Sequence, residues 1–155
     1  MACYCTPRGK PVSAIEKVSE LLGGRKVLGK KLHSQLELIP LLRRGLPYEA
    51  LESLTDKLDI SVDVASVALQ LARRTLARRK ESNRLDAQES ERIVRLADIA
   101  ARATSILGSV EKAKQWLTAQ NRALGGAAPI SFLDTDVGTR AVEDVLLRIE
   151  HGVYS

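Results

Sequence analysis

Three short amphipathic segments follow one another closely in the middle of the chain, and they restrict the possible folds more than any other feature. The first begins at Pro47, which suits the first turn of a helix, and its leucines recur every three or four residues. The second is Val62–Leu69, preceded by Ser61, whose hydroxyl is a good helix N-cap. The third lies within Ala72–Arg84. Three helices of about ten residues in this order are typical of a helix-turn-helix, in which the second helix braces the third in the DNA major groove.

The third segment, Ala72–Arg84, concentrates the positive charge of the protein. It contains six of the 24 Lys and Arg residues and one of the 19 acidic residues, and so accounts for the whole net charge of +5. Its predicted inner face consists of Leu69, Ala72 and Leu76, whereas Arg74 and Arg78 point the opposite way. A solvated basic face is the common alternative for such a run of charges. The candidate DNA-binding residues are Arg73, Arg74, Thr75, Arg78, Arg79, Lys80 and Arg84.

The link between the second and third segments, Leu69-Gln70-Leu71, lacks a residue that helix-turn-helix proteins often carry. Their turn often contains a Gly, which adopts a left-handed backbone at little cost. Either Gln70 accepts a slightly strained turn, or the two helices meet at another angle. The expected inner face of the second helix consists of Val64, Val67, Ala68 and Leu71.

Shorter elements precede these segments. A helical pattern starts at Ser13 and stops at Gly23-Gly24. Gly24–Lys30 then matches a phosphate-binding P-loop, except that Lys31 replaces the Ser or Thr that holds magnesium. An amphipathic helix rather than a buried strand precedes it, so we interpret it as a turn with solvated lysines. Gln35–Leu42, which contains a Pro, is either a short extended segment or a broken helix.

The longest predicted helix starts at Asp86, which forms an Asp-x-x-Glu capping arrangement with Glu89, and it ends at Gly108. Its apolar stripe is rich in Ala, and small residues let another helix approach closely. The stripe is therefore either the spine of the monomer, which we favour, or part of a dimer seam. Ser109 caps the next helix, on which Trp116 is expected to pack in the core.

The C-terminal part of the chain is acidic, with five acids and two arginines in residues 130–155. Asp134 or Thr135 is expected to cap a final helix that ends at Gly152. The apolar stripe of this helix consists of Ala141, Val142, Val145, Leu146 and Ile149. The chain thus combines a basic middle segment with an acidic, apolar-striped helix at its end.

Composition narrows the class of protein further. Aromatic residues are scarce, so the core must consist mainly of Leu, Val, Ile and Ala, which suits packed helices. No apolar run approaches the ~20 residues that span a bilayer, and no signal-peptide core precedes the first helix. Cys3 and Cys5 are too close together to cross-link distant parts of a fold, so we expect a cytoplasmic protein.

His33 and His151 have no neighbours at metal-ligand spacing, and we expect no metal, cofactor or enzymatic activity.

Several motifs resemble those of the Xre/MbcA/ParS antitoxins and occur in that family's order. The C-terminal motifs, which look like the family's toxin-binding domain, are Arg122-Ala-Leu-Gly-Gly126, Pro129, Phe132-Leu-Asp-Thr135, Gly138, Ala141-Val-Glu-Asp-Val145 and Arg148-Ile-Glu-His-Gly152. The motifs that look like its helix-turn-helix and its characteristic spacing are Gly45-Leu-Pro47, Arg73-Arg-Thr-Leu-Ala-Arg-Arg-Lys80 and Lys112-Ala-x-x-Trp-Leu117. Together they cover about residues 20–155, and the C-terminal set is the most specific. Gln70 departs from the family's pattern, because the family usually carries Gly at this position.

The resemblance implies an all-α antitoxin of a type II toxin–antitoxin system, with an N-terminal Xre-like helix-turn-helix bundle followed by a small helical toxin-binding domain. Its partner would be a RES-domain toxin, an enzyme related to ADP-ribosyltransferases that consumes NAD or transfers its ADP-ribose. The C-terminal segment would block the toxin's active-site cleft, and the rest would form a homodimer that binds operator DNA and represses the operon. The implied toxin contacts are Leu133, Asp134, Val142, Leu146, Ile149, Gly152, Val153 and Tyr154.

We therefore expect three regions: a flexible N-terminus over residues 1–12, a dimerisation and helix-turn-helix region over residues 13–107, and a toxin-binding domain over residues 108–155. The alternative for Val142, Leu146 and Ile149 is that they pack on this protein's own core. The alternative function is a plain helix-turn-helix transcriptional regulator whose C-terminal helix only dimerises.

Overall fold

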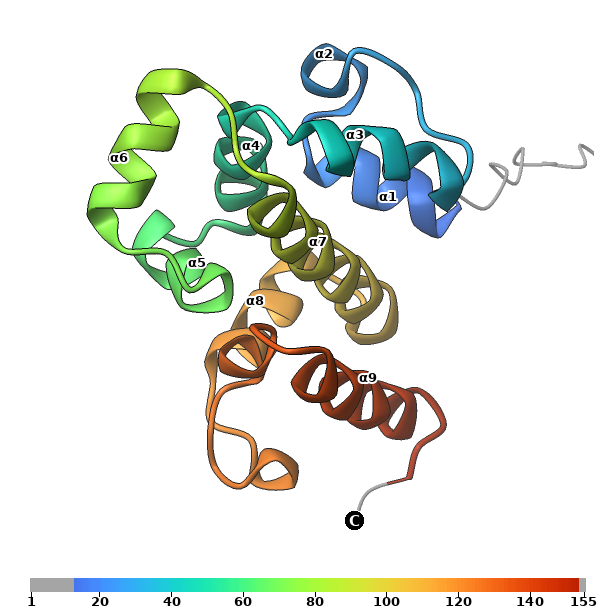
Figure 1. Cartoon of the computed structure of the whole chain (residues 1–155). Coiled ribbons are helices and arrows are strands. Elements are labelled where there is room, and N and C mark those ends of the chain that lie inside the picture. The colour runs from blue at the N-terminus through green and yellow to red at the C-terminus, as the bar shows by residue number, and fades with distance from the viewer. Residues whose placement is uncertain (1–12, 154–155) are drawn as a thin grey trace, which may run out of the picture.

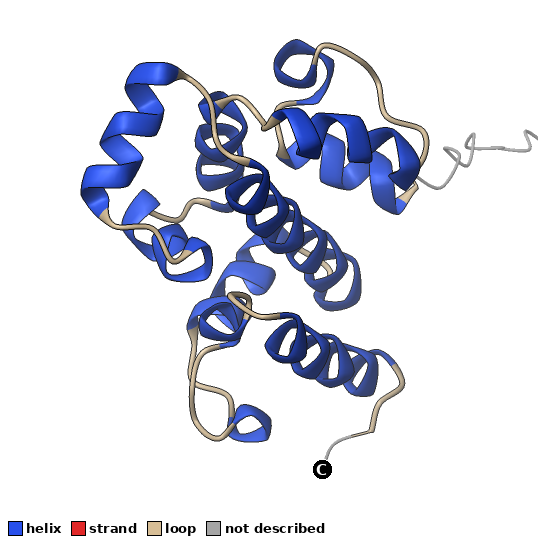
Figure 2. Cartoon of the chain, viewed as in Figure 1, coloured by secondary structure: helices blue, strands red, loops and turns tan. Residues whose placement is uncertain are grey.

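A computed structural model describes residues 13–153, and within that range the protein contains helices and turns but no strand (Figure 2). The α-helices are α1 (Ala14–Leu21), α2 (Gly24–Leu28), α3 (Leu38–Arg44), α4 (Tyr48–Leu58), α5 (Val62–Leu69), α6 (Arg73–Ser82), α7 (Ala87–Leu107), α8 (Val110–Thr118) and α9 (Asp136–Glu150). Single 3-10 turns are η1 (Gln35–Glu37), η2 (Arg122–Leu124) and η3 (Pro129–Phe132). The predicted all-α class is confirmed. None of the helices described combines the length and apolar character needed to cross a membrane.

Helix α7 is the centre of the fold, and α1, α3, α4, α5, α8 and α9 all pack against it (Figure 1). It starts with the predicted capping box, in which the Asp86 carboxylate accepts from the Glu89 backbone N–H and the Glu89 carboxylate accepts in return. The small residues Ala97, Ala100 and Ala103 are fully buried within the chain itself. The predicted spine is therefore confirmed, and these three residues have no surface left for a dimer seam.

The structure of the first helices answers the question that the sequence left open, the conformation of Gln35–Leu42, and corrects the expected turn at Gly24–Lys30. Pro40 lies in the first turn of α3, where a backbone N–H has no partner within the helix, so the Pro does not break it. The undecided stretch Gln35–Leu42 is therefore a 3-10 turn followed by an α-helix. The turn expected over Gly24–Lys30 instead contains the short helix α2, which ends at Gly29 in a left-handed conformation. A P-loop follows a buried strand, whereas this stretch follows helix α1. Gly24–Lys30 is therefore not a P-loop.

Two connections hold the α3–α4 link against the start of α7. The Leu46 N–H donates to the buried Ser90 hydroxyl at 2.8 Å, and the Leu85 N–H donates to the Leu46 carbonyl at 2.9 Å. Gly45 has a φ of 89°, and a Cβ there would lie 2.0 Å from the Leu85 carbonyl oxygen. Only Gly fits this position, which explains the Gly45-Leu46-Pro47 motif.

A polar contact joins the α4–α5 link to α8. The Lys114 ammonium donates to the Asp59 carboxylate at 2.6 Å, and this hydrogen bond and the positive charge lower the pKa of Asp59. Trp116, on the same helix, is half-buried against the core as expected. Helix α8 and its contacts thus connect the helix-turn-helix region to the C-terminal elements.

Candidate functional site

Helices α5 and α6 form a helix-turn-helix whose turn depends on Gln70. This residue has φ 49° and ψ 44°, the left-handed conformation that a Gly usually supplies. Ser61 caps α5 as predicted, because its hydroxyl accepts from the Val64 N–H at 3.2 Å. Of the two alternatives, the backbone favours the first, because Gln70 itself adopts the left-handed conformation of the turn.

The buried face of α5 differs from the prediction. Ala65, Ala68 and Leu69 are fully buried, whereas Val67 is 52% exposed. The expectation that Val67 faces inward was wrong, because α5 approaches α7 and η3 through its alanines and leaves Val67 on the opposite face. Alanine permits this close approach, and the apolar periodicity alone did not indicate which side was covered.

Helix α6 is held to the rest of the protein by few side chains, and each half of the helix has one of them. Leu76 is its one buried apolar side chain, and Ala72, predicted to face inward, is an exposed N-cap that offers no capping side chain. Arg79 provides the second anchor, since its guanidinium lies 2.9 Å from Glu89 and 3.2 Å from Asp86. Leu76 therefore holds the N-terminal half of α6, and Arg79 holds its C-terminal half.

Arg79 has a structural role that its sequence context did not reveal. Its partner Glu89 has only 5% of its side chain exposed and also takes part in the capping box of α7. A guanidinium that neutralises a buried carboxylate is not free to leave it for a phosphate. Arg79 therefore attaches α6 to the start of α7. Its role as a DNA contact stays a prediction, and we leave it out of the surface defined below.

Replacing Arg79 with Ala should lower the free energy of unfolding by roughly 2–3 kcal/mol, because Glu89 would keep a buried charge without its partner. Arg78→Ala is the matched control, since Arg78 is exposed one residue earlier on the same helix. Its change should stay within about 0.5 kcal/mol. Urea unfolding followed by circular dichroism measures both, and equal effects of the two changes would contradict the structural role of Arg79.

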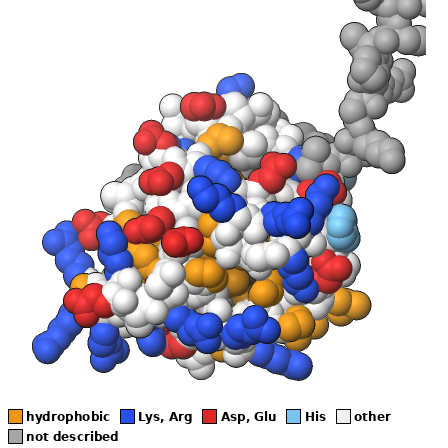
Figure 3. Space-filling view, turned by 90° about the horizontal axis from the view of Figure 1, so that it is seen from above, with side chains coloured by type: hydrophobic (Ala, Val, Ile, Leu, Met, Phe, Trp, Pro, Cys, Tyr) orange, Lys and Arg blue, Asp and Glu red, His pale blue; other side chains and the backbone are white. Residues whose placement is uncertain are grey.

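The remaining basic side chains of α6, and Arg84 just after its end, project into solvent. Among residues 13–153, Arg74, Arg78 and Arg84 form no ion pair. Arg73 pairs with Asp63 at 2.8 Å and Lys80 pairs with Glu52 at 3.4 Å, but both pairs are exposed and cost little to break. We call Arg73, Arg74, Arg78, Lys80 and Arg84 the α6 basic surface. Figure 3 shows Lys and Arg side chains along the left edge of the molecule, where α6 lies.

Two further residues complete the surroundings of α6. Thr75, also a candidate DNA contact, is half-buried on the first turn of the helix. Tyr48 lies buried near Lys80, and burial, with a smaller contribution from Glu52, raises the pKa of its phenol despite the lysine. Tyr48 therefore stays neutral near physiological pH and acts as a packing residue of α4.

The second candidate surface is built around α9, whose start is closely fitted to η3. Thr135 is the N-cap, and its hydroxyl accepts from the Gly138 N–H at 3.0 Å. A Cβ on Gly138 would lie 2.1 Å from the Phe132 carbonyl oxygen, so only Gly allows this approach. The sequence left Asp134 and Thr135 open as caps, and Thr135 is the one observed.

The structure divides the predicted toxin contacts into buried and accessible residues. Leu133, Val142 and Leu146 are at most 1% exposed and belong to the chain's own core, so their assignment as direct contacts is corrected. Ile149 and Asp134 are half-buried. Val153 is 56% exposed, and Gly152 is exposed with a left-handed φ of 69°. Tyr154 lies outside the described residues.

The exposed face of α9 contains an apolar residue that the sequence reasoning missed. Leu147 is 46% exposed and lies beside Val153 in a shallow depression. The signal was available, because Leu147 is an apolar residue outside the stripe that runs from Ala141 to Ile149. We call the residues that line this depression, Asp144, Leu147, Arg148, His151 and Val153, the α9 C-terminal surface.

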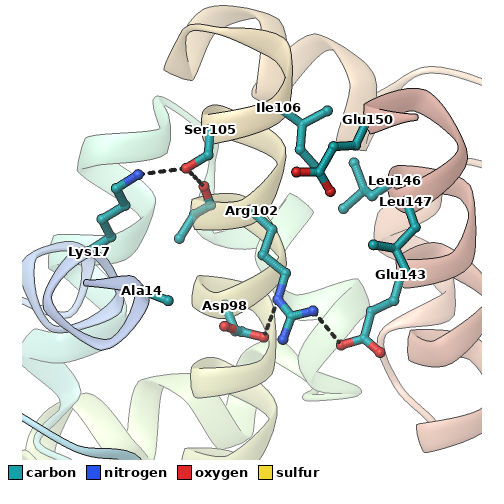
Figure 4. A pocket seen from close by; sticks show the side chains of 11 residues that line it. Ala14, Lys17, Asp98, Arg102, Ser105, Ile106, Glu143, Leu146, Leu147 and Glu150 are labelled. Carbon is teal, nitrogen blue, oxygen red and sulfur yellow. Dashed lines mark hydrogen bonds and ion pairs between the residues drawn. The ribbon is translucent and has the colours of Figure 1, made fainter. Parts of the chain in front are cut away.

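A small cavity of about 280 Å³ lies between α1, α7 and α9, and polar side chains on its walls join these helices (Figure 4). The Arg102 guanidinium bridges Asp98 at 3.1 Å on its own helix and Glu143 at 3.6 Å on α9. On the opposite wall the Lys17 ammonium donates to the Ser105 hydroxyl at 2.7 Å. The Arg102–Glu143 pair thus joins α9 to α7, and the Lys17–Ser105 hydrogen bond joins α1 to α7.

The described part of the chain offers no cluster of three or more His, Cys, Asp or Glu side chains that could hold a metal ion. His33 and His151 are both exposed. The arrangement observed over residues 13–153 is that of two separate candidate surfaces on a helical scaffold. These are the α6 basic surface and the α9 C-terminal surface.

Two family descriptions match this chain in adjoining stretches. Residues 37–98 match the antitoxin Xre-like helix-turn-helix domain, and residues 102–152 match the antitoxin Xre/MbcA/ParS C-terminal toxin-binding domain. The first contains α3 to α6 and each includes part of α7. The α6 basic surface lies in the first stretch, and most of the α9 C-terminal surface lies in the second.

Individual relatives agree with these matches. The protein "Antitoxin Xre" of Yersinia enterocolitica is 31% identical over 122 residues, which are 76% of this chain and 81% of that protein. "Antitoxin Xre" of Pseudomonas putida is 40% identical over 80 residues, so this chain spans about half of its length. "Prs ADP-ribosylating antitoxin" of a Sphingobium species is 27% identical over 132 residues, which are 79% of this chain and 83% of that protein.

Proposed function

This chain belongs to the Xre/MbcA/ParS antitoxin family, and on that premise we propose that it inhibits a RES-domain toxin and represses its own operon. The observation that carries the proposal is the separation of its two surfaces: α6 and the C-terminal end of α9 lie at opposite ends of the molecule (Figure 1). One protein can therefore contact DNA and a toxin at the same time. The match to a toxin-binding domain argues against the alternative of a plain transcriptional regulator.

The α9 C-terminal surface has the chemistry to enter a cleft made for a dinucleotide. A cleft that binds NAD combines apolar walls for the rings with basic groups for the phosphates. Leu147 and Val153 are exposed apolar groups, and Asp144 is an exposed acid beside them. We assign the direct contacts to these residues and to Gly152 and Tyr154, with Ile149 and Asp134 at the edge.

The buried residues of the C-terminal region have a supporting function in this proposal. Leu133, Val142 and Leu146 fix α9 on α7 and thereby fix the position of the exposed surface. Their substitution would reduce inhibition through loss of stability rather than through loss of a contact.

We keep Gly108, where α7 ends, as the boundary between the helix-turn-helix region and the toxin-binding domain.

The test of the proposed function uses the product of the gene adjacent to this one, purified as a RES-domain toxin. The toxin consumes NAD in the absence of this protein, and an equimolar amount of this protein should stop the loss of NAD. Bovine serum albumin at the same concentration serves as the control. Undiminished NAD consumption would overturn the proposed inhibition, whatever the outcome of the DNA experiments described below.

A homodimer is part of the proposal, because helix-turn-helix proteins usually bind two half-sites through two-fold symmetry. Leu36 is 74% exposed and Ile39 is 39% exposed, beside a groove of about 430 Å³ between α1, α3 and α7. Exposed apolar groups of this size beside a groove are typical of an interaction surface. We propose that a second copy of the chain covers them.

Changing Leu36 and Ile39 together to Asp should convert the dimer to a monomer, because the charges would have to be buried at the interface. Sedimentation equilibrium measures the mass, and the single change Leu147→Asp is the matched control at another exposed Leu. The control should remain a dimer. A double variant that sediments as a dimer, or a wild-type protein that sediments as a monomer, would contradict this assignment.

A further inference from the structure

The turn of the helix-turn-helix is connected to the C-terminal region by one side-chain hydrogen bond. The Gln70 amide nitrogen donates to an Asp134 carboxylate oxygen at 2.7 Å, although the two residues are 64 positions apart in the sequence. Gln70 is the residue with the left-handed backbone between α5 and α6. Asp134 lies immediately before Thr135, the N-cap of α9. A residue of the toxin-binding region thus holds the residue that sets the turn.

Asp134 is well placed to act as a fixed anchor. The preceding residue, Leu133, is fully buried, and its carbonyl accepts from the Arg95 guanidinium at 3.2 Å. The same guanidinium forms an ion pair with Asp136. Arg95 therefore binds on both sides of Asp134, so the carboxylate that faces Gln70 is attached to a backbone with little freedom to move.

The turn receives a second connection from α7. The Arg92 guanidinium donates to the Leu69 carbonyl at 2.8 Å, one residue before Gln70. Beyond the turn, α6 begins at Ala72 without a capping side chain, and its nearest buried side chain is Leu76. The turn at Leu69 and Gln70 therefore sets, together with the anchors Leu76 and Arg79, the direction in which α6 leaves α5. Arg73 and Arg74 lie between the turn and Leu76, so the turn has its largest influence on their positions.

We propose that Asp134 is a positioning residue for DNA recognition, which acts through Gln70 and compensates for the absence of a Gly in the turn. A left-handed conformation is unfavourable for Gln and easily adopted by Gly. The charge-assisted hydrogen bond that the Gln70 amide donates to the Asp134 carboxylate holds the Gln side chain in place and so stabilises the turn. A Gly at position 70 would need no such support. This inference rests on the proposed operator binding, and it assigns to the toxin-binding region a part in reading DNA.

The experiment is a double-mutant cycle on the full-length protein. Fluorescence anisotropy measures the Kd for a labelled duplex that covers the promoter region of the operon, with wild type, Asp134→Ala, Gln70→Gly and the double variant. Asp134→Ala should weaken binding about fivefold in the wild-type background, as expected for loss of one charge-assisted hydrogen bond. In the Gln70→Gly background the same change should alter Kd by less than about twofold, because the turn no longer depends on Asp134.

The cycle separates positioning from other effects of Asp134. Removing a negative charge near DNA favours binding electrostatically, but it does so equally in both backgrounds and cancels in the comparison. Asp134→Asn keeps an acceptor oxygen without the charge, and it should recover most of the affinity that Asp134→Ala loses. Circular dichroism of each variant reports helix content, which should stay unchanged because the contact is exposed.

Two results would overturn the inference while leaving the proposed function in place. One is an equal loss of affinity for Asp134→Ala in both backgrounds, and the other is no loss in the wild-type background. Failure of the wild-type protein to bind the duplex would instead overturn the proposed repression, and this inference with it.

Discussion

Replacing Arg74 and Arg78 together with Ala is expected to abolish operator binding and to leave inhibition of the toxin intact. Both guanidinium groups are exposed and form no ion pair within residues 13–153, so they are available to phosphates and base edges. A dimer would lose four such groups, which corresponds to a decrease in affinity of at least about 100-fold. Because neither side chain supports the core, the melting temperature should change little.

The salt dependence of operator binding tests the same surface independently. A dimer with about four phosphate contacts per protomer predicts a slope near −7 for log K against log salt concentration. A single change, Arg74→Ala, should reduce that slope by about 2 for the dimer. Lys112→Ala with Arg122→Ala is the matched control, since both residues are exposed on other elements. Simultaneous loss of DNA binding and toxin inhibition in the Arg74 and Arg78 variant would mean that α6 is a structural element only.

The complementary prediction concerns the other end of the molecule. Changing Leu147 and Val153 together to Asp should raise the inhibition constant for the toxin by at least about 100-fold, because two apolar contacts at the centre of an interface would become charged. Operator binding should be unchanged. Both side chains are about half exposed, at 46% and 56%, so the fold should tolerate the change. Residual NAD consumption at increasing antitoxin concentration provides the measurement.

Val137→Asp is the matched control for this prediction. Val137 is 78% exposed on the same helix, but it lies at the N-terminal end of α9. Inhibition by this variant should equal that of the wild type. A truncated protein without residues 152–155 should lose inhibition as the double variant does. If the truncated protein and the double variant both inhibited normally, the C-terminal end of α9 would not be the part that blocks the toxin.

Local signals in the sequence predicted the helices well. Ser61, Asp86 and Ser109 all cap the helices that they were expected to cap, because a capping side chain interacts with residues only a few positions away. The periodic apolar residues of α7 and α9 likewise face inward, with Ile93 and Val142 fully buried. Information of this kind is contained within one turn of helix, so the sequence alone is sufficient.

The sequence could not show which partner each side chain would meet. The apolar stripe of α9 was a possible interface or a part of the core, and periodicity is the same in both cases; the structure places Val142 and Leu146 in the core. Charge alone likewise does not distinguish Arg78 from Arg79, although only Arg79 pairs with the buried Glu89. Gln70 is a third case, because its support comes from a residue 64 positions away.

Hydrogen exchange measured by mass spectrometry tests most directly whether this antitoxin has two separate working surfaces. Exchange of the free protein is compared with exchange in the presence of the toxin and, separately, of the operator duplex. The toxin should slow exchange in residues 144–153 and leave residues 73–80 unchanged, and the duplex should do the reverse. Slowing by both partners in the same segment, or no slowing of residues 144–153 by the toxin, would contradict the account.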